Sequence, residues 1–431
     1  MTQLNSVDLV QQHPQRIKIP CVSFFKRYFN TNSLIIAIFF SLPIYLSIFG
    51  ENLIIKILNS IISIIAFYLF FNQKHSFFQT GFFIGIFWFY WIGLSFRYYN
   101  LSYLIPFIIL FIGIGYGIIF WILNKIFSLF KFSIFHLPFS ILLWGLFFIF
   151  GFDYLKPFTF DWLKPEVLIS NSLFLPYKIT LFLLILAIIL KNKFSFILIL
   201  IPLFFSKPHI DKPNLKINLI TTYIPQDKKW DKNFIPQEIK NNFKHIQNSI
   251  NREYDVVVLP ESAFPIFLNR YPNLIKKLKE LSTKITIITG ALHLKNNQFY
   301  NSTYIFEDKK MIILDKHILV PFGEYIPFPF FQKEINKIFF NGASDYKTSK
   351  NFGEFKIKNY TFLNAICYEA TIEKLYQKKP KYVIAMSNMA WFMPSIAPIL
   401  QKLLINIYAL KYKKRVYHSL NYYKSYKIPR K

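Results

Sequence analysis

The most restrictive feature of this sequence is a series of apolar runs between residues 34 and 206, followed by a mixed, lysine-rich sequence up to residue 431. A helix needs about 20 mainly apolar residues to cross the hydrocarbon core of a bilayer. Seven runs approach this length and predict membrane spans at residues 34–49, 53–71, 77–96, 103–123, 134–152, 173–190 and 194–205. The first and last runs are short for a span, so a count of six stays open as an alternative.

Basic residues gather in alternate loops of this predicted bundle. They are Arg16, Lys18, Lys26 and Arg27 before the first span, Lys74 after the second, Lys125 and Lys131 after the fourth, and Lys191 and Lys193 after the sixth. Because loops rich in Lys and Arg stay in the cytoplasm, residues 1–33 are predicted to be a cytoplasmic segment without a cleaved signal peptide. With seven spans, residues 207–431 emerge on the extracytoplasmic face, whereas six spans would leave them in the cytoplasm.

The chain has a formal net charge of +29, from 51 Lys and Arg against 22 Asp and Glu. Its lysines are scattered over residues 207–431 and form no compact basic stripe, so nucleic-acid binding is not expected. Attraction to anionic lipid headgroups fits this distribution better. The predicted spans contain few ionisable residues, which argues against a transporter with an ion path through the membrane.

Residues 207–431 alternate between short strand-like and helix-like segments. Strands are predicted at 215–222, 254–259, 284–289, 360–366 and 382–386, a hairpin at 300–306 with 311–314, and helices at 236–251 and 272–282. Strands that interleave with helices give a layered α/β sandwich. The sequence thus predicts a cytoplasmic segment (1–33), a multi-pass α-helical transmembrane bundle (34–206) and an extracytoplasmic α/β domain (207–431).

A single cysteine in this domain, Cys367, directly follows the predicted strand 360–366 and precedes a helix-like segment at 370–377. Nearby helix-terminus N–H groups are expected to favour its thiolate form. The chain has one other cysteine, Cys21, so there is no disulfide framework. A buried, inert cysteine is the alternative interpretation.

Two more polar signals fall at predicted strand ends. Glu261 lies between Pro260 and Pro265 after the strand 254–259, where rigidity and partial desolvation suit a general base with a raised pKa. Lys316 follows the hairpin and enters an apolar stretch, where it can act as a fixed cation for an oxyanion, with Glu324 to orient it. Alone, Glu261 also fits a helix-capping acid and Lys316 a surface lysine on a loop. Together with Cys367, the two residues indicate an acyl-transfer site.

The sequences around these three residues resemble one known family. They are Pro260-Glu261-Ser262-Ala263, the run from Lys316 to Glu324 that ends in Pro-Phe-Gly-Glu, and Ile366-Cys367-Tyr368-Glu369. The domain resembles the nitrilase (carbon–nitrogen hydrolase) superfamily, and with the preceding spans it resembles the apolipoprotein N-acyltransferases of the bacterial inner membrane. Further matching segments are Ile224-Pro225-Gln226 with Trp230, and Ser387-Asn388 with Ala390-Trp391-Phe392.

This resemblance implies an αββα sandwich and a two-step reaction through a thioester. Cys367 would attack an acyl ester of a phospholipid, Glu261 would take the thiol proton, and Lys316 would stabilise the oxyanion. The acyl group would then pass to the α-amino group of the diacylglyceryl-cysteine of an apolipoprotein.

The resemblance also implies binding or supporting roles for Trp230, Glu324, Tyr368 and Glu369. It implies no metal and no organic cofactor, and no His or Cys stands at metal-ligand spacing from His317. The expected partners are a phospholipid acyl donor, an apolipoprotein acceptor and the bilayer itself. The expected location is the bacterial inner membrane, with the catalytic domain on the periplasmic side.

Four stretches extend or depart from the family pattern. Residues 322–331 with 335–340, and residues 391–407, are apolar and are expected to line an entrance at the bilayer surface. Met389 stands where the family usually has Asp or Asn. The family usually ends with one more span, whereas residues 411–431 are basic and aromatic and are expected to lie on lipid headgroups.

Two other functions remain open from the residues alone. The domain is either a membrane-anchored nitrilase-type amidase that transfers its acyl group to water, or a non-catalytic binding module that keeps the fold. Hydrolysis of a thioester on Cys367, rather than transfer to an amine, would identify the amidase. A thiol no more reactive than a free cysteine would identify the binding module.

Overall fold

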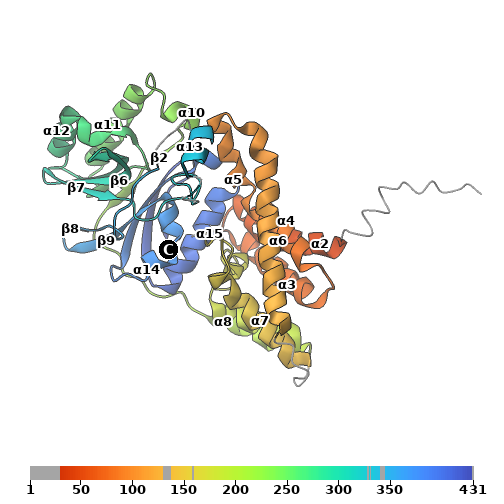
Figure 1. Cartoon of the computed structure of the whole chain (residues 1–431). Helices are drawn as coiled ribbons and strands as arrows, with labels where there is room; N and C mark the ends of the chain where they lie inside the picture. The colour runs from red at the N-terminus through yellow and green to blue at the C-terminus, as the bar shows by residue number, and fades with distance from the viewer. Residues whose placement is uncertain are drawn as a thin grey trace, which may run out of the picture.

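A computed structural model describes residues 30–129, 137–157, 160–327, 330, 332–339 and 345–429 of the chain. A bundle of apolar helices lies beside an α/β sandwich, and helix α15 (Ala397–Lys411) runs between the two (Figure 1). Most of the predicted N-terminal segment, with Cys21, lies outside the described residues.

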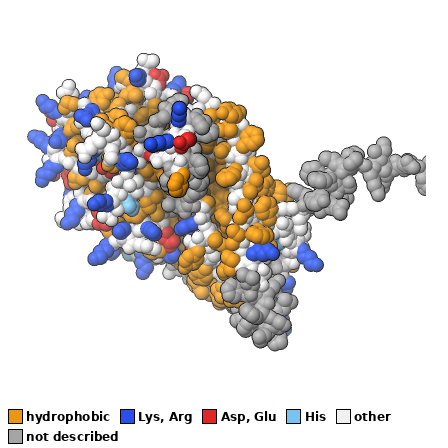
Figure 2. Space-filling model, in the orientation of Figure 1, with side chains coloured by type: hydrophobic (Ala, Val, Ile, Leu, Met, Phe, Trp, Pro, Cys, Tyr) orange, Lys and Arg blue, Asp and Glu red, His pale blue; other side chains and the backbone are white. Residues whose placement is uncertain are grey.

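Apolar helices occur at the predicted span positions. They are α2 (Thr31–Leu46), α3 (Leu53–Asn72), α4 (Phe77–Phe89), α5 (Trp91–Leu94), α6 (Ile105–Leu129), α7 (Leu137–Tyr154), α8 (Lys178–Leu190) and α9 (Phe196–Leu200). On α6, exposed Phe107, Phe111, Ile114, Ile118 and Trp121 recur every three or four residues and so form one outward apolar face. Figure 2 shows this apolar surface over α6, with the lysines scattered over the sandwich.

Within the described residues, three helical segments are long and apolar enough to cross a membrane: Thr31–Phe49, Leu53–Asn72 and Ser102–Ser128. A fourth span exists if Phe77–Phe89 and Trp91–Tyr99, bent by 43°, form one crossing, and α7 and α8 provide shorter apolar helices. The chain is therefore a multi-pass membrane protein, but these helices do not add up to the predicted seven spans.

The seventh predicted span, at 194–205, is not one continuous helix, so the count of seven spans stays a prediction. It contains only α9 and the 3-10 helix η5 (Ile201–Phe204). Nine residues of this kind rise about 15 Å, roughly half of the hydrocarbon thickness. Pro202 within η5 lacks a backbone N–H and limits the continuation of the helix.

The α/β part is a sandwich of two six-stranded sheets. In the first sheet the order is β1 (Ile217–Leu219), β3 (Val256–Val258), β5 (Thr286–Lys295), β6 (Gln298–Glu307) and β7 (Lys310–Asp315), with β4 (Phe264–Phe267) beside β5. In the second it is β12 (Tyr426–Ile428), β11 (Arg415–Asn421), β10 (Tyr382–Asn388), β9 (Tyr360–Ile366) and β8 (Glu354–Ile357), with β2 (Thr221–Thr222) beside β11.

Strand periodicity explains the layers. Val256 and Val258 pack between the sheets against Ile384 and Met386, whereas Val257 faces the opposite way. That outer face is covered by α11 (Ile235–Asn251) and α12 (Pro272–Leu281). The second sheet is covered by α14 (Glu373–Tyr376) and α15, which also pack against the bundle. This is the predicted αββα sandwich. Most predicted strands and helices from 215 to 386 are found to within two residues, but β5 extends six residues past the predicted end at 289, and the helix-like segment at 370–377 is divided between η8 (Cys367–Thr371) and α14.

Two predicted surface stretches are instead part of the core. Residues 415–421 form the buried strand β11 inside the second sheet, and β12 follows it, so this segment does not lie on lipid headgroups. The part of 391–407 that forms α15 is mostly buried and does not line an entrance. Near the other predicted entrance, Phe330 is 94 % exposed; much of 322–331 and 335–340 lies outside the residues whose side chains are described.

Close packing of α4 against α6 depends on glycine. A Cβ on Gly81 would lie 2.6 Å from the carbonyl oxygen of Tyr116 and 2.7 Å from Cβ of Phe120, too close for either helix to stay in place. A Cβ on Gly115, also on α6, would have no atom within 4 Å.

We therefore expect Gly81→Ala to destabilise the bundle by about 1–3 kcal/mol, because the added methyl group overpacks the contact. Gly115→Ala, the matched control, should be neutral or stabilising by up to about 1 kcal/mol through helix propensity. Thermal unfolding of the detergent-solubilised variants measures both, and equal stability of the two would show that the close contact is not needed.

Candidate active site

The structure brings together the three residues predicted to carry the chemistry. Glu261 follows β3, Lys316 follows β7, and Cys367 follows β9. All three are buried or nearly so, and their charges act on one another: Glu261 and Lys316 both shift the pKa of Cys367. Three segments that are distant in the sequence therefore meet at one edge of the sandwich.

Cys367 begins the 3-10 helix η8 (Cys367–Thr371) with a φ of +53°, a left-handed conformation that is uncommon outside glycine. The carboxylate of Glu369 supports this turn. It accepts hydrogen bonds from the backbone N–H of Ile366 (2.8 Å), His317 (2.7 Å) and Ile318 (3.1 Å). Glu369 therefore joins the cysteine turn to the loop that follows Lys316.

Glu261 is held from both sides. Its Oε1 accepts from Nδ2 of Asn301 at 2.9 Å, and its Oε2 accepts from the backbone N–H of Asn388 at 2.8 Å. The carboxylate also acts on the nearby thiol of Cys367 and raises its pKa. A fixed carboxylate near the thiol can serve as the general base that takes the thiol proton.

Lys316 is 1 % exposed and is paired with Glu324. Its Nζ donates to the two carboxylate oxygens of Glu324 at 2.9 Å and 2.7 Å. Glu324 also accepts from the backbone N–H of Val320 at 2.9 Å and from Nδ2 of Asn301 at 3.1 Å. Asn301 therefore bridges the carboxylates of Glu261 and Glu324.

Burial sets the protonation of this cluster. It raises the pKa of Glu261, and the nearby Glu324 raises it further, although Lys316 acts in the opposite direction. Burial alone would lower the pKa of Lys316, but the carboxylates of Glu324 and Glu261 outweigh it and raise this pKa, so the lysine stays charged.

The predicted thiolate form of Cys367 is wrong. Burial raises the pKa of the thiol, and the negative charge of Glu261 raises it further. The short η8 turn and Lys316 do not offset these two effects, so Cys367 rests as a thiol and depends on a base for its reactivity.

The four predicted supporting residues have different positions. Glu324 and Glu369 contact the cluster as described above. Tyr368 is buried and its ring stacks on Phe160 of the α7–α8 segment, with centroids 6.2 Å apart. Trp230 follows α10 (Gln226–Lys229) and is 39 % exposed.

Sequence reasoning missed Asn301. A run of polar residues, Asn301-Ser302-Thr303, in the middle of a predicted strand was the available signal, because buried polar side chains in a sheet need specific partners. Nδ1 of His317 lies 2.8 Å from the carbonyl oxygen of Ser349. Among the described residues, no group of three or more His, Cys, Asp or Glu side chains is arranged to hold a metal.

The raised pKa of the thiol predicts a pH profile. In a Cys21→Ser background, the midpoint of Cys367 alkylation by iodoacetamide should lie above the value of about 8.5 for a free cysteine. Glu261→Gln removes a negative charge that disfavours the thiolate, so the midpoint should move to lower pH. An unchanged or higher midpoint in Glu261→Gln would contradict the described effect of the Glu261 charge on the thiol.

Glu369→Gln should lower the free energy of unfolding by about 1–3 kcal/mol, because an amide cannot accept from all three backbone N–H groups. Glu354→Gln, at an exposed position on β8, is the control and should unfold like the wild type. Thermal unfolding compares the two, and equal stability would exclude the supporting role of Glu369.

Comparison with known proteins gives a consistent result. Residues 27–208 match the model of the apolipoprotein N-acyltransferase integral membrane domain, and residues 224–414 match the carbon-nitrogen hydrolase model. The apolipoprotein N-acyltransferase of Wolinella succinogenes is 39 % identical over 408 residues, which cover 91 % of this chain and 95 % of the relative. Those of Campylobacter jejuni (38 %, covering 94 % and 92 %) and Helicobacter pylori (36 %, covering 92 % and 95 %) are similarly related. The chain belongs to the apolipoprotein N-acyltransferase family.

Proposed function

We propose that this protein transfers a fatty acyl chain from a phospholipid to the α-amino group of an S-diacylglyceryl-cysteine at the N-terminus of an apolipoprotein. The single observation that carries the mechanism is the buried cluster in which Glu261, held by Asn301 and Asn388, and the charged Lys316 both act on the Cys367 thiol. Family membership supports the substrates, because the relatives named above are apolipoprotein N-acyltransferases.

In the first step, Glu261 takes the thiol proton as Sγ of Cys367 attacks the ester carbonyl carbon of the phospholipid. Negative charge develops on the carbonyl oxygen, and Lys316 stabilises it as a fixed cation. The C–O ester bond then breaks, and the leaving glycerol oxygen takes the proton from Glu261. A lyso-phospholipid departs and an acyl thioester stays on Cys367.

In the second step, the α-amino nitrogen of the apolipoprotein attacks the thioester carbonyl carbon. Glu261 accepts a proton from this nitrogen, the C–S bond breaks, and the proton returns to Sγ of Cys367. The products are an N-acylated lipoprotein and the resting thiol, so no oxidant, metal or organic cofactor is required.

The remaining site residues support these steps. Glu324 orients Lys316 through its two ion-pair contacts, and Glu369 holds the cysteine turn. We assign Trp230 to substrate binding, because its half-exposed ring offers apolar surface to a lipid. Tyr368 supports the turn from the side of the bundle.

The distribution of basic residues supports a periplasmic catalytic domain in the inner membrane. Loops after α2 and α5 contact the sandwich: Glu51 pairs with Lys402, and Arg97 donates to the carbonyl oxygen of Met393. Lys74 follows α3 and Lys191 follows α8, so both lie in loops at the helix ends opposite to those that contact the sandwich. By the positive-inside rule, those opposite ends are cytoplasmic.

An amidase that transfers its acyl group to water is less well supported. The matched integral membrane domain and the names of the relatives both favour acyl transfer to a lipoprotein amine. The three proposed catalytic residues are also all present in one cluster, where their charges act on one another, and this disfavours a non-catalytic binding module.

Intact-mass analysis of the purified protein with a phospholipid tests the proposal. Wild type should gain a hydroxylamine-labile acyl adduct that a diacylglyceryl-cysteine peptide discharges onto its amine, whereas Cys367→Ala should gain none. Lys316→Met should acylate at least about a hundredfold more slowly, as expected for loss of an oxyanion-stabilising group.

Lys309→Met, at an exposed lysine in the β6–β7 turn, is the control and should behave like the wild type. An adduct that persists in Cys367→Ala would exclude Cys367 as the nucleophile. Discharge to water at the same rate with and without the peptide would favour the amidase instead.

A further inference from the structure

The segment that joins α7 to α8 is buried although it is charged. Every residue from 161 to 172 is buried, including Asp161, Lys164 and Glu166, and the 3-10 helix η4 (Pro165–Ile169) lies within it. A connection between helices normally runs over the surface, because buried backbone and charged groups need partners. Specific partners must therefore stabilise this segment in the interior of the protein.

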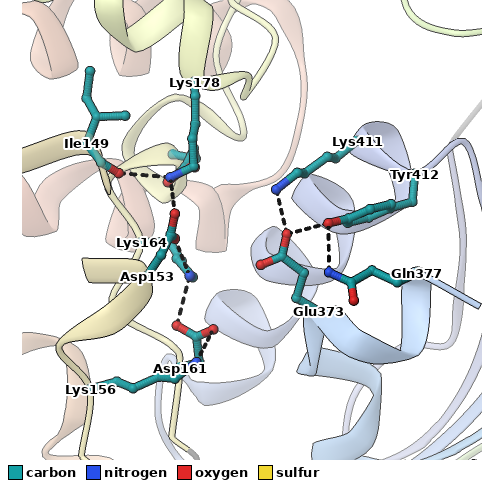
Figure 3. A network of polar contacts seen from close by, with 11 residues as sticks. Ile149, Asp153, Lys156, Asp161, Lys164, Lys178, Glu373, Gln377, Lys411 and Tyr412 are labelled. Carbon is teal, nitrogen blue, oxygen red and sulfur yellow. Dashed lines mark hydrogen bonds and ion pairs between the residues drawn. The ribbon is translucent and has the colours of Figure 1, made fainter. Parts of the chain in front are cut away.

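A network of ion pairs fixes the segment against the helix ends (Figure 3). Nζ of Lys164 lies 2.6 Å from Oδ1 of Asp153 and 2.9 Å from Oδ1 of Asp161. Nζ of Lys178, at the start of α8, lies 2.7 Å from Oδ2 of Asp153 and 3.1 Å from Oε1 of Glu166. Because a buried charge without its partner is costly, this network holds the segment in one arrangement.

The fixed segment reaches the turn that carries Cys367. Nε1 of Trp162 donates to Oγ1 of Thr371 at 2.8 Å, and Oγ1 of Thr371 donates to the carbonyl oxygen of Tyr368 at 2.7 Å. Phe160 stacks on Tyr368 with an interplanar angle of 5°, and on Trp162 with centroids 5.3 Å apart. Tyr368 and Thr371 both belong to η8, which Cys367 begins.

We propose that Trp162 of the α7–α8 segment is a positioning residue for Cys367, and that it acts through its hydrogen bond to Thr371. The membrane part of the chain thereby completes the catalytic site of the α/β domain. This inference rests on the proposed role of Cys367 as the nucleophile.

The conformation of Cys367 explains the need for such support. Its φ of +53° is a strained value for a non-glycine residue, and strain of this kind persists only where the surroundings impose it. Glu369 holds the turn from the side of the Lys316 loop. Trp162 and Phe160 hold it from the side of the bundle, so the thiol is fixed against Glu261 from two directions.

The test compares variants of the full-length protein in detergent, in a Cys21→Ser background. Trp162→Phe removes the N–H donor together with part of the ring, a loss that the Trp88→Phe control shares. Thr371→Val removes the acceptor and also the hydrogen bond from Thr371 to the carbonyl oxygen of Tyr368. Each should slow formation of the acyl thioester about tenfold, the effect of losing one well-placed hydrogen bond, with the KM for phospholipid unchanged. The double variant should be no slower than the slower of the two single variants, and Thr371→Ser should retain the wild-type rate.

Trp88→Phe is the matched control. Trp88 is also a buried tryptophan of the bundle, but its Nε1 has no hydrogen-bond partner among the described residues. This variant should acylate at the wild-type rate. If Trp162→Phe acylates like Trp88→Phe, or if the effects of Trp162→Phe and Thr371→Val multiply, the positioning role is excluded.

A second measurement does not depend on acyl transfer. A thiol that moves away from Glu261 loses part of the effect that raises its pKa, so the pH midpoint of Cys367 alkylation should fall in Trp162→Phe and stay unchanged in Trp88→Phe. Unchanged midpoints in both would overturn the positioning role. If the wild type forms no thioester, the proposed function fails, and these midpoints alone then decide whether Trp162 positions the thiol.

Discussion

The buried ammonium group of Lys316 makes the rest of the site possible. Three carboxylates, those of Glu261, Glu324 and Glu369, are gathered around it in a nearly water-free region, where isolated negative charges would be strongly disfavoured. Glu324 is neutralised directly by its ion pair with the lysine. Glu369 is satisfied mainly by three backbone N–H groups. Burial raises the pKa of both Glu369 and Glu261. For Glu261, a raised pKa suits a base that must accept a proton and return it.

A shared hydrophobic core joins the bundle to the sandwich. One cluster of buried residues extends from α2, α4 and α7 through α15 to β9 and β10, and it includes Tyr368 and Ala370 next to Cys367. Both proposed substrates have acyl chains in the bilayer, so a nucleophile anchored to the bundle stays at a fixed position relative to the lipid. The packing thus accounts for why an αββα sandwich of this kind is attached to a membrane domain through core contacts rather than through a flexible linker.

Much of the fold and the main chemistry were predictable from the sequence. The mainly apolar run from Tyr360 to Ile366 predicted β9 with its observed ends, and the motifs around Glu261, Lys316 and Cys367 marked three strand ends that meet in space. These signals are local, so the sequence carries them directly. Periodicity also predicted the two outer helices of the first sheet.

Features set by tertiary context were not predictable in this way. The basic and aromatic residues Arg415 to Asn421 form an inner strand that pairs with β10, β12 and β2. No local pattern predicts this strand, because its position depends on partners from other parts of the chain. The thiol state of Cys367 depends on burial and on Glu261, which outweigh the local helix turn. The bridging role of Asn301 likewise exists only once Glu261 and Glu324 are side by side.

The central claim is that Glu261 activates a resting, neutral thiol inside this cluster. The pH dependence of the single-turnover rate of lyso-phospholipid release tests it most directly. The rate should rise as Glu261 loses its proton, at a pH above the ordinary glutamate value of about 4.3, and then stay level to about pH 8.5, because the base removes the thiol proton during the reaction. A rate that instead keeps rising in proportion to hydroxide from pH 7 to 8.5 would contradict the account, since free thiolate would then be the reactive form.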